Sequence, residues 1–287
     1  MLKTNRDKLV AISVQGEITH PGVASAYRVG WDGVARVLPG TGGITYNVRI
    51  GDCCIGWAGD HVEPGVTTKN LKDERQNMAY NYYACIGNTA TVVSGDAKGA
   101  KGRVTGKHGG AEHVIVDFDP SDMEKMAIGD RVQIKGYGLG LVLTDFPGVK
   151  VMSLSPDILD KMDVKVVKGK LQVPVTHIVP CQLMGSGLGG QMAEKGDYDI
   201  MTHDKAYIKE QGLDDLRFGD LVAIPDHASF YGRQYQRGSM TIGVVVHSDC
   251  NGSGHGPGIT TLLTSMTSEI APVVSEKANL AHFFGIE

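Results

Sequence analysis

The most polar loop of the chain directly follows an apolar segment. Residues 241–246 (TIGVVV) are typical of a buried strand, and residues 247–258 (HSDCNGSGHGPG) continue it as a glycine-rich loop. Side chains alternate between the two faces of a strand, so we expect His247 and Asp249 on one face, with His255 returning to them across the loop. Imidazole and carboxylate groups bind divalent metal ions. The pattern predicts a metal site at His247, Asp249 and His255 for a divalent ion of unspecified identity, and an ordinary glycine turn is the alternative.

The dipeptide Asp-His occurs twice after a segment that begins with a Gly-Asp turn. Asp60-His61 follows the turn at 51–52, and Asp226-His227 follows the turn at 219–220. A carboxylate beside an imidazole can transfer protons in general acid–base catalysis. We predict that Asp60, His61, Asp226 and His227 are catalytic groups at one rim of a sheet built from strands 52–60 and 220–226. Chance recurrence of a dipeptide is the alternative, and Glu63 lies close by as a further ligand or proton carrier.

Two arginines in residues 231–238 (YGRQYQRG) are candidates for substrate binding. Arg233 and Arg237 can each form paired hydrogen bonds with a carboxylate or phosphate, although an exposed hairpin with solvated arginines has the same pattern. We expect Cys250 to be a small buried residue rather than a nucleophile. The isolated histidines are expected to be surface or core residues: His20, His108, His177 and His282.

A basic glycine-containing loop joins two strand-like segments between Val92 and Val104. Its glycines are Gly95, Gly99 and Gly102, and a further strand is expected toward 114–116. This stretch resembles the KOW motif, a strand-loop-strand unit of small β-barrels in ribosomal proteins and transcription elongation factors. The resemblance implies a small β-barrel at 88–145. If the protein instead binds nucleic acid, the basic residues of this loop would form the binding surface: Lys98, Lys101, Arg103 and Lys107.

The elements around these candidate sites are mostly strands. Alternating apolar residues predict strands at 11–14, 26–29, 34–37 and 46–50, arranged as a meander. A helix is expected over 70–86, and short helices are expected from Ser155-Pro156 and over 204–210. We therefore predict a mainly β fold with few short helices. A β sandwich-type main domain (1–87 and 146–287) would carry the small KOW-like barrel (88–145).

Composition limits the class of protein. The formal net charge is -4, so no global positive field would attract nucleic acid, and 39 glycines indicate many tight turns. Five scattered cysteines do not suggest a disulfide scaffold. The apolar run at 9–14 is too short for a signal peptide, and no segment has the roughly 20 apolar residues of a membrane helix. We expect a cytoplasmic homo-oligomer that acts on a small-molecule substrate and not on a membrane.

The order of these motifs resembles an uncharacterised prokaryotic family, a domain of unknown function that spans the full length. A fainter resemblance is to the acetamidase/formamidase enzymes, and it rests on residues 247–252, although Cys250-Asn251 replace the expected acidic residue. This likeness implies a metal-dependent hydrolase that cleaves a C–N bond. Two alternatives stay open: a nucleic-acid-binding protein that uses the basic loop, and a structural or oligomer-forming β protein.

Overall fold

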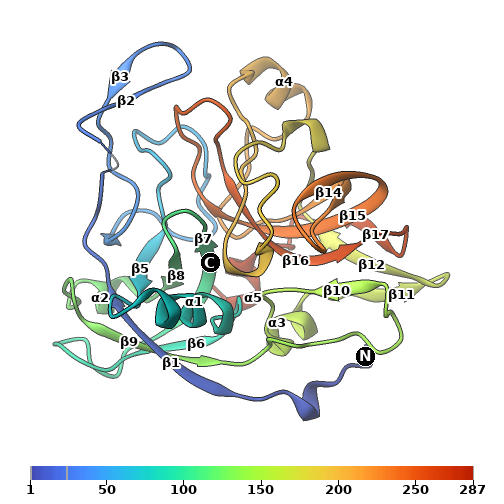
Figure 1. Ribbon diagram of the computed structural model, residues 1–287, viewed down its shortest axis with the longest axis horizontal. Helices are drawn as coiled ribbons and strands as arrows, with labels where there is room; N and C mark the ends of the chain where they lie inside the picture. Colours follow the sequence, from blue (N-terminus) through green and yellow to red (C-terminus); the bar gives the residue numbers. More distant parts are fainter. Residues whose placement is uncertain (1, 24, 287) are drawn as a thin grey trace.

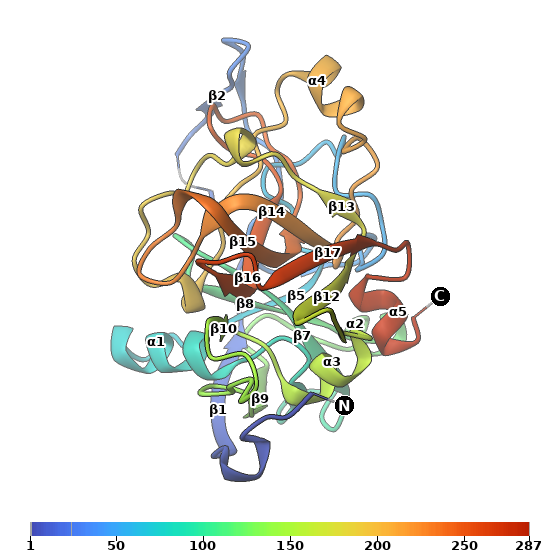
Figure 2. The same cartoon turned by 90° about the vertical axis from the view of Figure 1, so that its right-hand side faces the viewer.

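The protein is mainly β with a few short helices, as the sequence predicted (Figures 1 and 2). The computed structural model describes residues 2–23 and 25–286. No helix in this part of the chain has the length and apolar character needed to cross a membrane.

Six antiparallel strands close into a barrel. In pairing order they are β1 (Ile12–Ile18), β9 (Arg131–Gly136), β6 (Thr89–Val92), β7 (Lys101–His108), β8 (His113–Asp117) and β5 (Gly65–Lys69). β1 pairs with β9 along one edge and with β5 along the other, which completes the ring and leaves no free edge between them. In β9, Val132 and Ile134 alternate with exposed residues and face the interior. β4 (Ile44–Thr45) pairs with β5 outside the ring.

The barrel uses more of the chain than the segment with the KOW-like pattern. Residues 88–145 supply β6, β7, β8 and β9, and β1 and β5 come from earlier in the chain. β1 therefore pairs with β9 and β5 rather than with β2, so the predicted N-terminal meander is wrong.

Three further sheets complete the fold. A five-stranded sheet has the order β10 (Val149–Val151), β16 (Gly258–Ser265), β15 (Gln234–His247), β14 (Leu221–Ala228) and β13 (His177–Ile178). A three-stranded sheet has the order β11 (Lys165–Val167), β12 (Lys170–Val175) and β17 (Ile270–Val274). β2 (Arg28–Val29) and β3 (Ala35–Arg36) form a hairpin that lies above the barrel in Figure 1.

The barrel and the five-stranded sheet pack against each other through β7, which lies against β15 and β16. A Cβ atom at Gly106 would lie 2.7 Å from Cβ of Val246, so glycine permits this close approach. Val104 of the barrel and Val244 of the sheet belong to one continuous apolar core. This contact brings the last residues of β7 and β15 together.

The helices are short and capped by polar side chains. They are α1 (Glu74–Tyr83), α2 (Pro120–Met123), α3 (Pro156–Lys161), α4 (Lys205–Glu210) and α5 (Leu280–Phe284), with 3-10 turns η1 (Arg6–Lys8), η2 (Cys181–Leu183) and η3 (Ala193–Lys195). Ser155 caps α3 and Asp204 caps α4, which confirms both predicted short helices. The helix predicted over 70–86 is shorter, because the side chain of Asp73 accepts a hydrogen bond from the amide of Gln76 and caps it there.

Two predicted strands are absent from the described residues. Residues 46–50 are irregular, although Val48 and Ile50 are buried, so their apolar pattern reflects core packing rather than a strand. Residues 52–60 form only an isolated bridge at Cys53. The other two Gly-Asp turns do precede strands, β9 and β14. The idea that 52–60 and 220–226 are equivalent strands of one sheet is therefore wrong.

Candidate metal centre

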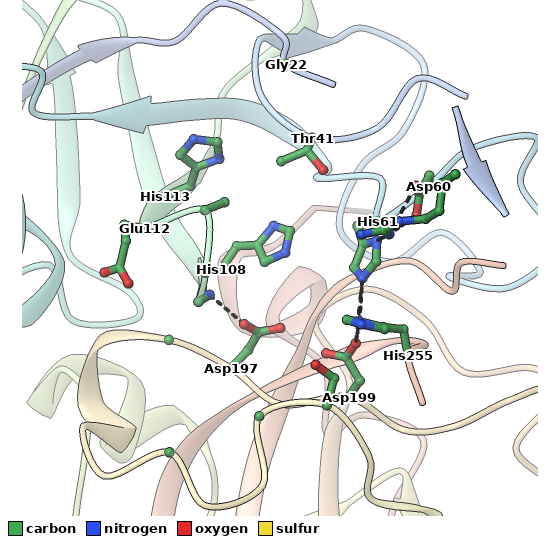
Figure 3. Close-up of a pocket in the computed structure, with 18 of the residues that line it drawn as sticks. Gly22, Thr41, Asp60, His61, His108, Glu112, His113, Asp197, Asp199 and His255 are labelled. Carbon is green, nitrogen blue, oxygen red and sulfur yellow. Dashed lines mark hydrogen bonds and ion pairs between the residues drawn. The ribbon is translucent and has the colours of Figure 1, made fainter. Parts of the chain in front are cut away.

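A cavity of about 850 Å³ opens beside the contact between the barrel and the five-stranded sheet. Figure 3 shows imidazole and carboxylate side chains from distant parts of the chain around its inner end. His108 is the last residue of β7, and His247 is the last residue of β15. Their ring centroids lie 4.4 Å apart, and that of His61 lies 4.9 Å from that of His247. The fold thus gathers three histidines that are far apart in the sequence.

Each of these imidazoles has its Nδ1 atom fixed by an acceptor. Nδ1 of His108 donates to the Glu63 carboxylate, Nδ1 of His247 donates to the Ser248 carbonyl (2.9 Å), and Nδ1 of His61 donates to Asp60 (2.7 Å). Carboxylate and carbonyl oxygens can only accept, so Nδ1 carries the proton in all three rings. In the neutral tautomer, Nε2 is then free to bind a cation, as in metal-ligating histidines whose second nitrogen is hydrogen-bonded.

Asp197 faces His247 at the bottom of the cavity. Its Oδ1 accepts a hydrogen bond from the Gly109 amide (2.6 Å), and its Oδ2 lies 2.6 Å from Nε2 of His247. These two facing atoms are buried and not aligned for hydrogen bonding, and neither has a hydrogen-bond partner among the described residues. Buried polar atoms normally find partners, so these two atoms, which have none, are available as ligands for a cation.

Charge compensation outweighs burial in this pair. Burial alone would raise the pKa of Asp197, but the imidazole charge of His247 holds that pKa below its ordinary value. Burial would lower the pKa of His247, but the Asp197 carboxylate raises it. Without a metal the electrostatics therefore favour a protonated His247 beside an ionised Asp197, and a bound cation would take the place of that proton.

Asp199 lies between the histidines. Its Oδ2 is 2.8 Å from Nδ1 of His255 and 3.6 Å from Nε2 of His61, and its Oδ1 is 3.7 Å from Nε2 of His247. Burial opposes ionisation, yet the hydrogen bonds from His255 and His61 hold the pKa of Asp199 well below its ordinary value. Burial likewise disfavours the charged form of His61, but Asp199 and Asp60 raise its pKa to about 12.

Glu63 is fully buried behind His108 and supports it. Besides His108, its carboxylate accepts hydrogen bonds from His113 (3.1 Å), the Thr67 hydroxyl (2.6 Å) and the Gly42 amide (2.7 Å). Burial would raise the pKa of Glu63, but the adjacent imidazoles of His108 and His113 hold it well below its ordinary value. A buried, fully bonded carboxylate of this kind orients an imidazole ligand and increases its basicity.

Among residues 2–23 and 25–286, four overlapping groups of three side chains could hold a metal ion. In each group, one ligand atom per residue lies within 4.8 Å of the others; the groups are His108/Asp197/His247, His61/Asp199/His247, His61/Cys250/His255 and Glu63/His108/His113. The buried His, Asp and Glu side chains of this cavity therefore have the composition and spacing of a metal centre.

The structure brings together only part of the predicted metal set. His247 and His255 both lie in the cluster, each within hydrogen-bonding or ion-pair distance of Asp197 or Asp199. Asp249 does not, because β15 ends at His247 and the alternation stops there. The Asp249 carboxylate accepts from the Gly56 amide (3.2 Å) and lies 3.6 Å from Nζ of Lys205.

The two predicted Asp-His pairs lie in different environments. Asp60 and His61 line the cavity. Asp226 accepts a hydrogen bond from the Gly238 amide in the β14–β15 hairpin, at a register shift between Pro225 and His227. His227 is buried and stacks on Tyr198, and burial together with the Arg233 charge lowers its pKa to about 4.

The predicted basic residues also lie in different environments, some buried and some exposed. Arg233 is 6% exposed and lines the cavity, whereas Arg237 is exposed on β15. Lys98, Lys101 and Arg103 are exposed, but Lys107 is fully buried, and its Nζ donates to the Ser153 hydroxyl (3.0 Å) and the Glu194 carbonyl (2.6 Å). Lys107 therefore cannot contribute to the predicted basic surface.

Sequence reasoning missed His108, Asp197 and Asp199. His108 was expected to be a surface or core residue, yet it pairs directly with His113 across a tight turn between β7 and β8. The signal that would have revealed this hairpin is the pair of histidines at 108 and 113 on either side of Gly109-Gly110 in an otherwise strand-like segment. Asp197 and Asp199 are spaced by two residues, which places both carboxylates on one side of an extended segment.

Comparison with known proteins agrees with the expected family. The model described as "Domain of unknown function (DUF4438), N-terminal" matches residues 27–160, and the model described as "Domain of unknown function (DUF4438), C-terminal" matches residues 161–284. A search of curated proteins finds no match. The chain is 46% identical to a solved structure titled "Crystal structure of TM1086", with a TM-score of 0.94 over 98% of this chain and 99% of the other. Because the two family models together span nearly all of the sequence, the chain belongs to the DUF4438 family.

Proposed function

We propose that the protein is a metal-dependent enzyme, hydrolase-like, that cleaves a C–N bond in a small polar metabolite. The observation that carries this proposal is the facing pair of His247 Nε2 and Asp197 Oδ2, both buried and without a hydrogen-bond partner among the described residues. His108 completes this group of ligand atoms, and Asp199 approaches it through Oδ1.

The ligand types indicate which cation fits. Two imidazoles with one or two carboxylates suit zinc and other divalent transition metals better than calcium or magnesium, which prefer oxygen ligands. Such an ion polarises a carbonyl group and lowers the pKa of a bound water, which supplies a nucleophile near neutral pH. The chain's own residues fix the imidazoles through Glu63 and Ser248, and they keep this end of the cavity buried.

The position of Arg233 indicates that the substrate carries a negative charge. Its guanidinium is buried at the cavity wall, contacts the carbonyls of Gly187 (3.4 Å) and Ala193 (3.3 Å), and lies 4.9 Å from the Tyr198 ring centroid. Its guanidinium hydrogen bonds go to carbonyl oxygens, and its Nε has no partner in the described ranges. A buried charge requires compensation, and a carboxylate or phosphate of the substrate would supply it. The cavity volume of about 850 Å³ suits a metabolite-sized ligand.

Asp60 and His61 are the groups best placed to move protons for this reaction. Asp60 fixes Nδ1 of His61, and Arg28 in turn contacts Asp60 at 3.1 Å. Nε2 of His61 faces the cavity beside Asp199. The second pair does not reach the cavity, and we assign it no catalytic role.

A substrate screen tests the proposed reaction. Protein loaded with zinc, cobalt or manganese is incubated with amides and cyclic amides that carry a carboxylate or phosphate, and release of amine or ammonia is measured. We expect turnover with loaded wild type, loss of turnover with Asp197→Asn, and a raised KM with Arg233→Gln. Turnover by metal-free wild type, or by Asp197→Asn, at the rate of loaded wild type would contradict a metal-dependent mechanism.

A further inference from the structure

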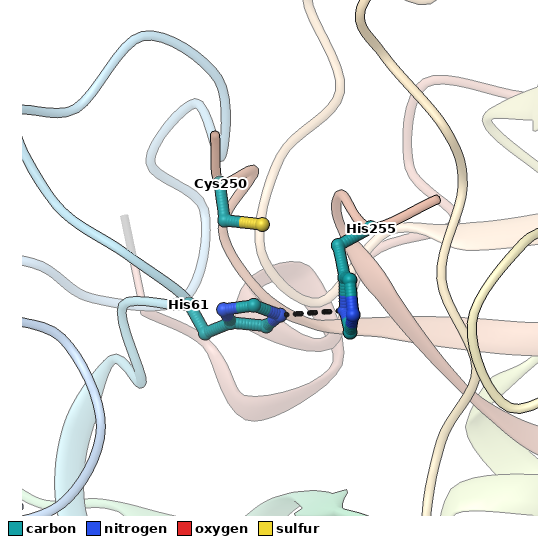
Figure 4. Close-up of side chains that lie close together, drawn as sticks. All are labelled: His61, Cys250 and His255. Atoms are coloured by element: carbon teal, nitrogen blue, oxygen red, sulfur yellow. Dashed lines mark hydrogen bonds between the residues drawn. The ribbon is translucent and has the colours of Figure 1, made fainter. Parts of the chain in front are cut away.

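Three side chains beside the proposed centre form a second group of potential ligands. His61, Cys250 and His255 each place one ligand atom within 4.8 Å of the other two (Figure 4). Nε2 of His61 lies 3.1 Å from Nδ1 of His255, so two ring nitrogens face each other at hydrogen-bonding distance. Cys250 is buried above them, which places a sulfur ligand next to two nitrogen ligands.

Asp199 supplies a fourth ligand atom to this group. Its Oδ2 lies 2.8 Å from Nδ1 of His255 and 3.6 Å from Nε2 of His61. Two ligand atoms bound to one zinc ion at about 2.1 Å in a tetrahedral arrangement lie roughly 3.4 Å apart. The separations among Asp199, His61 and His255 therefore already approximate the edges of a coordination shell.

The loop after β15 is built to hold Cys250 and His255 together. The Gly252 amide donates to Sγ of Cys250 (3.2 Å), and the His255 amide donates to the Gly252 carbonyl (3.1 Å). A Cβ atom at Gly252 would lie 3.3 Å from the His255 ring and 3.5 Å from the Cys250 sulfur, so glycine keeps the space between them open.

We propose that His61, Cys250, His255 and Oδ2 of Asp199 bind a second transition-metal cation. This inference rests on the proposed function for the first cation, which His108, His247 and Asp197 would hold. In the chain with both cations, Nε2 of His61 binds metal instead of transferring protons. Oδ1 of Asp199 lies 3.7 Å from Nε2 of His247, so its two oxygens face the two groups separately and the carboxylate can bridge them. Binding releases the thiol proton of Cys250 to solvent, and the ring proton of His255 moves from Nδ1 to Nε2, which leaves Nδ1 free for the cation. The thiolate selects zinc, cobalt or a similar ion over magnesium and calcium.

Cobalt titration tests this second site. Co²⁺ is added to the full chain after chelation and dialysis, and the near-ultraviolet thiolate-to-cobalt charge-transfer band is recorded together with bound cobalt per chain. We expect two ions and a clear band with wild type, and one ion and no band with Cys250→Ser or His255→Gln. The matched control Cys181→Ser, which removes a partly exposed thiol outside the cavity, keeps both ions and the band.

His247→Gln separates this inference from the proposed function. It should lose one ion yet keep the charge-transfer band, because Cys250 is untouched. A wild-type protein that binds one ion without the band, or a band that persists in Cys250→Ser, overturns the second site and leaves the first intact. A wild-type protein that binds no cobalt overturns both, and circular dichroism confirms that each variant is folded.

Discussion

Single hydrogen bonds decide which nitrogen of each histidine is left to bind a cation. Glu63, Ser248 and Asp60 accept from Nδ1 of His108, His247 and His61 and thereby direct Nε2 inward. Glu63 is the most heavily bonded of these acceptors and is fully buried. Metal affinity should therefore depend on residues that do not themselves contact the cation.

Glu63→Gln tests this dependence. An amide has nearly the same shape but lacks the charge that increases the basicity of His108, so we expect the metal affinity to fall roughly 10- to 100-fold. Isothermal titration with zinc measures the change. The control is Glu269→Gln, which alters a carboxylate hydrogen-bonded to Thr267 on another surface and should leave the affinity unchanged. Equal affinities for the two variants would contradict the supporting role of Glu63.

His227 gives a prediction about acid stability. Its pKa in the folded protein is about 4, whereas an unfolded histidine titrates near 6.5. Both states are neutral above about pH 7, and as the pH falls toward 4 the unfolded state takes up a proton first, so the folded state loses stability. His227→Phe keeps a ring against Tyr198 and removes the titration.

The free energy of unfolding, measured with urea at several pH values, reports this effect. Between about pH 7 and 4 it should fall by up to about 3 kcal/mol more in wild type than in His227→Phe. Parallel curves for the two proteins would show that His227 does not carry the effect.

The sequence revealed the candidate residues that lie on conspicuous local patterns and missed those that only the fold brings together. His247, His255 and His61 stand on glycine loops or next to acidic residues, so their types and neighbours marked them. Asp197 and His108 are separated by 88 intervening residues and meet because β7 and the segment that holds Asp197 both lie against β16. Periodicity within one segment contains no information on such a contact.

At the scale of elements, the joint between β7 and β15 sets the distance between His108 and His247. Gly106 touches Val246 at this joint, two residues before His108 and one residue before His247. The elements that were predicted correctly, such as α3 with its Ser155 cap, depend on local signals. The segment 46–50 was predicted wrongly because buried residues without a pairing partner have the same apolar pattern as a strand.

Gly106→Ala should push β7 and β15 apart, because the added methyl group would overlap with Val246. We expect overpacking to lower the free energy of unfolding by about 1–3 kcal/mol and to weaken metal binding as well, because one ligand lies on each side of the joint. Gly22→Ala is the control, since nothing lies within 4 Å of a Cβ atom there. Adding Val246→Ala to Gly106→Ala should recover part of the loss in a double-mutant cycle, and strictly additive effects would contradict the steric explanation.

For the whole molecule, the candidate ligands come from both the barrel and the five-stranded sheet. His108 belongs to β7, His247 to β15, and Asp197 to the segment between η3 and α4. A cation held by all three would bind the folded state and not the unfolded chain, so it should stabilise the protein by mass action.

Zinc should therefore raise the free energy of unfolding. At a free concentration about 100 times the Kd, the expected increase is about 2.7 kcal/mol. Chemical denaturation with and without zinc measures it, and His108→Gln should remove the part of the increase that the first ion contributes. A rise of the same size in that variant would place the stabilising ion elsewhere.

Metal content tests the central claim most directly. Wild type, His247→Gln and the control His282→Gln, which changes an exposed histidine on α5, are purified without chelator and analysed for transition metals. The account predicts stoichiometric metal in wild type and in His282→Gln, and a loss of at least one ion per chain in His247→Gln. Wild-type protein without bound metal, or equal metal in all three proteins, would contradict it.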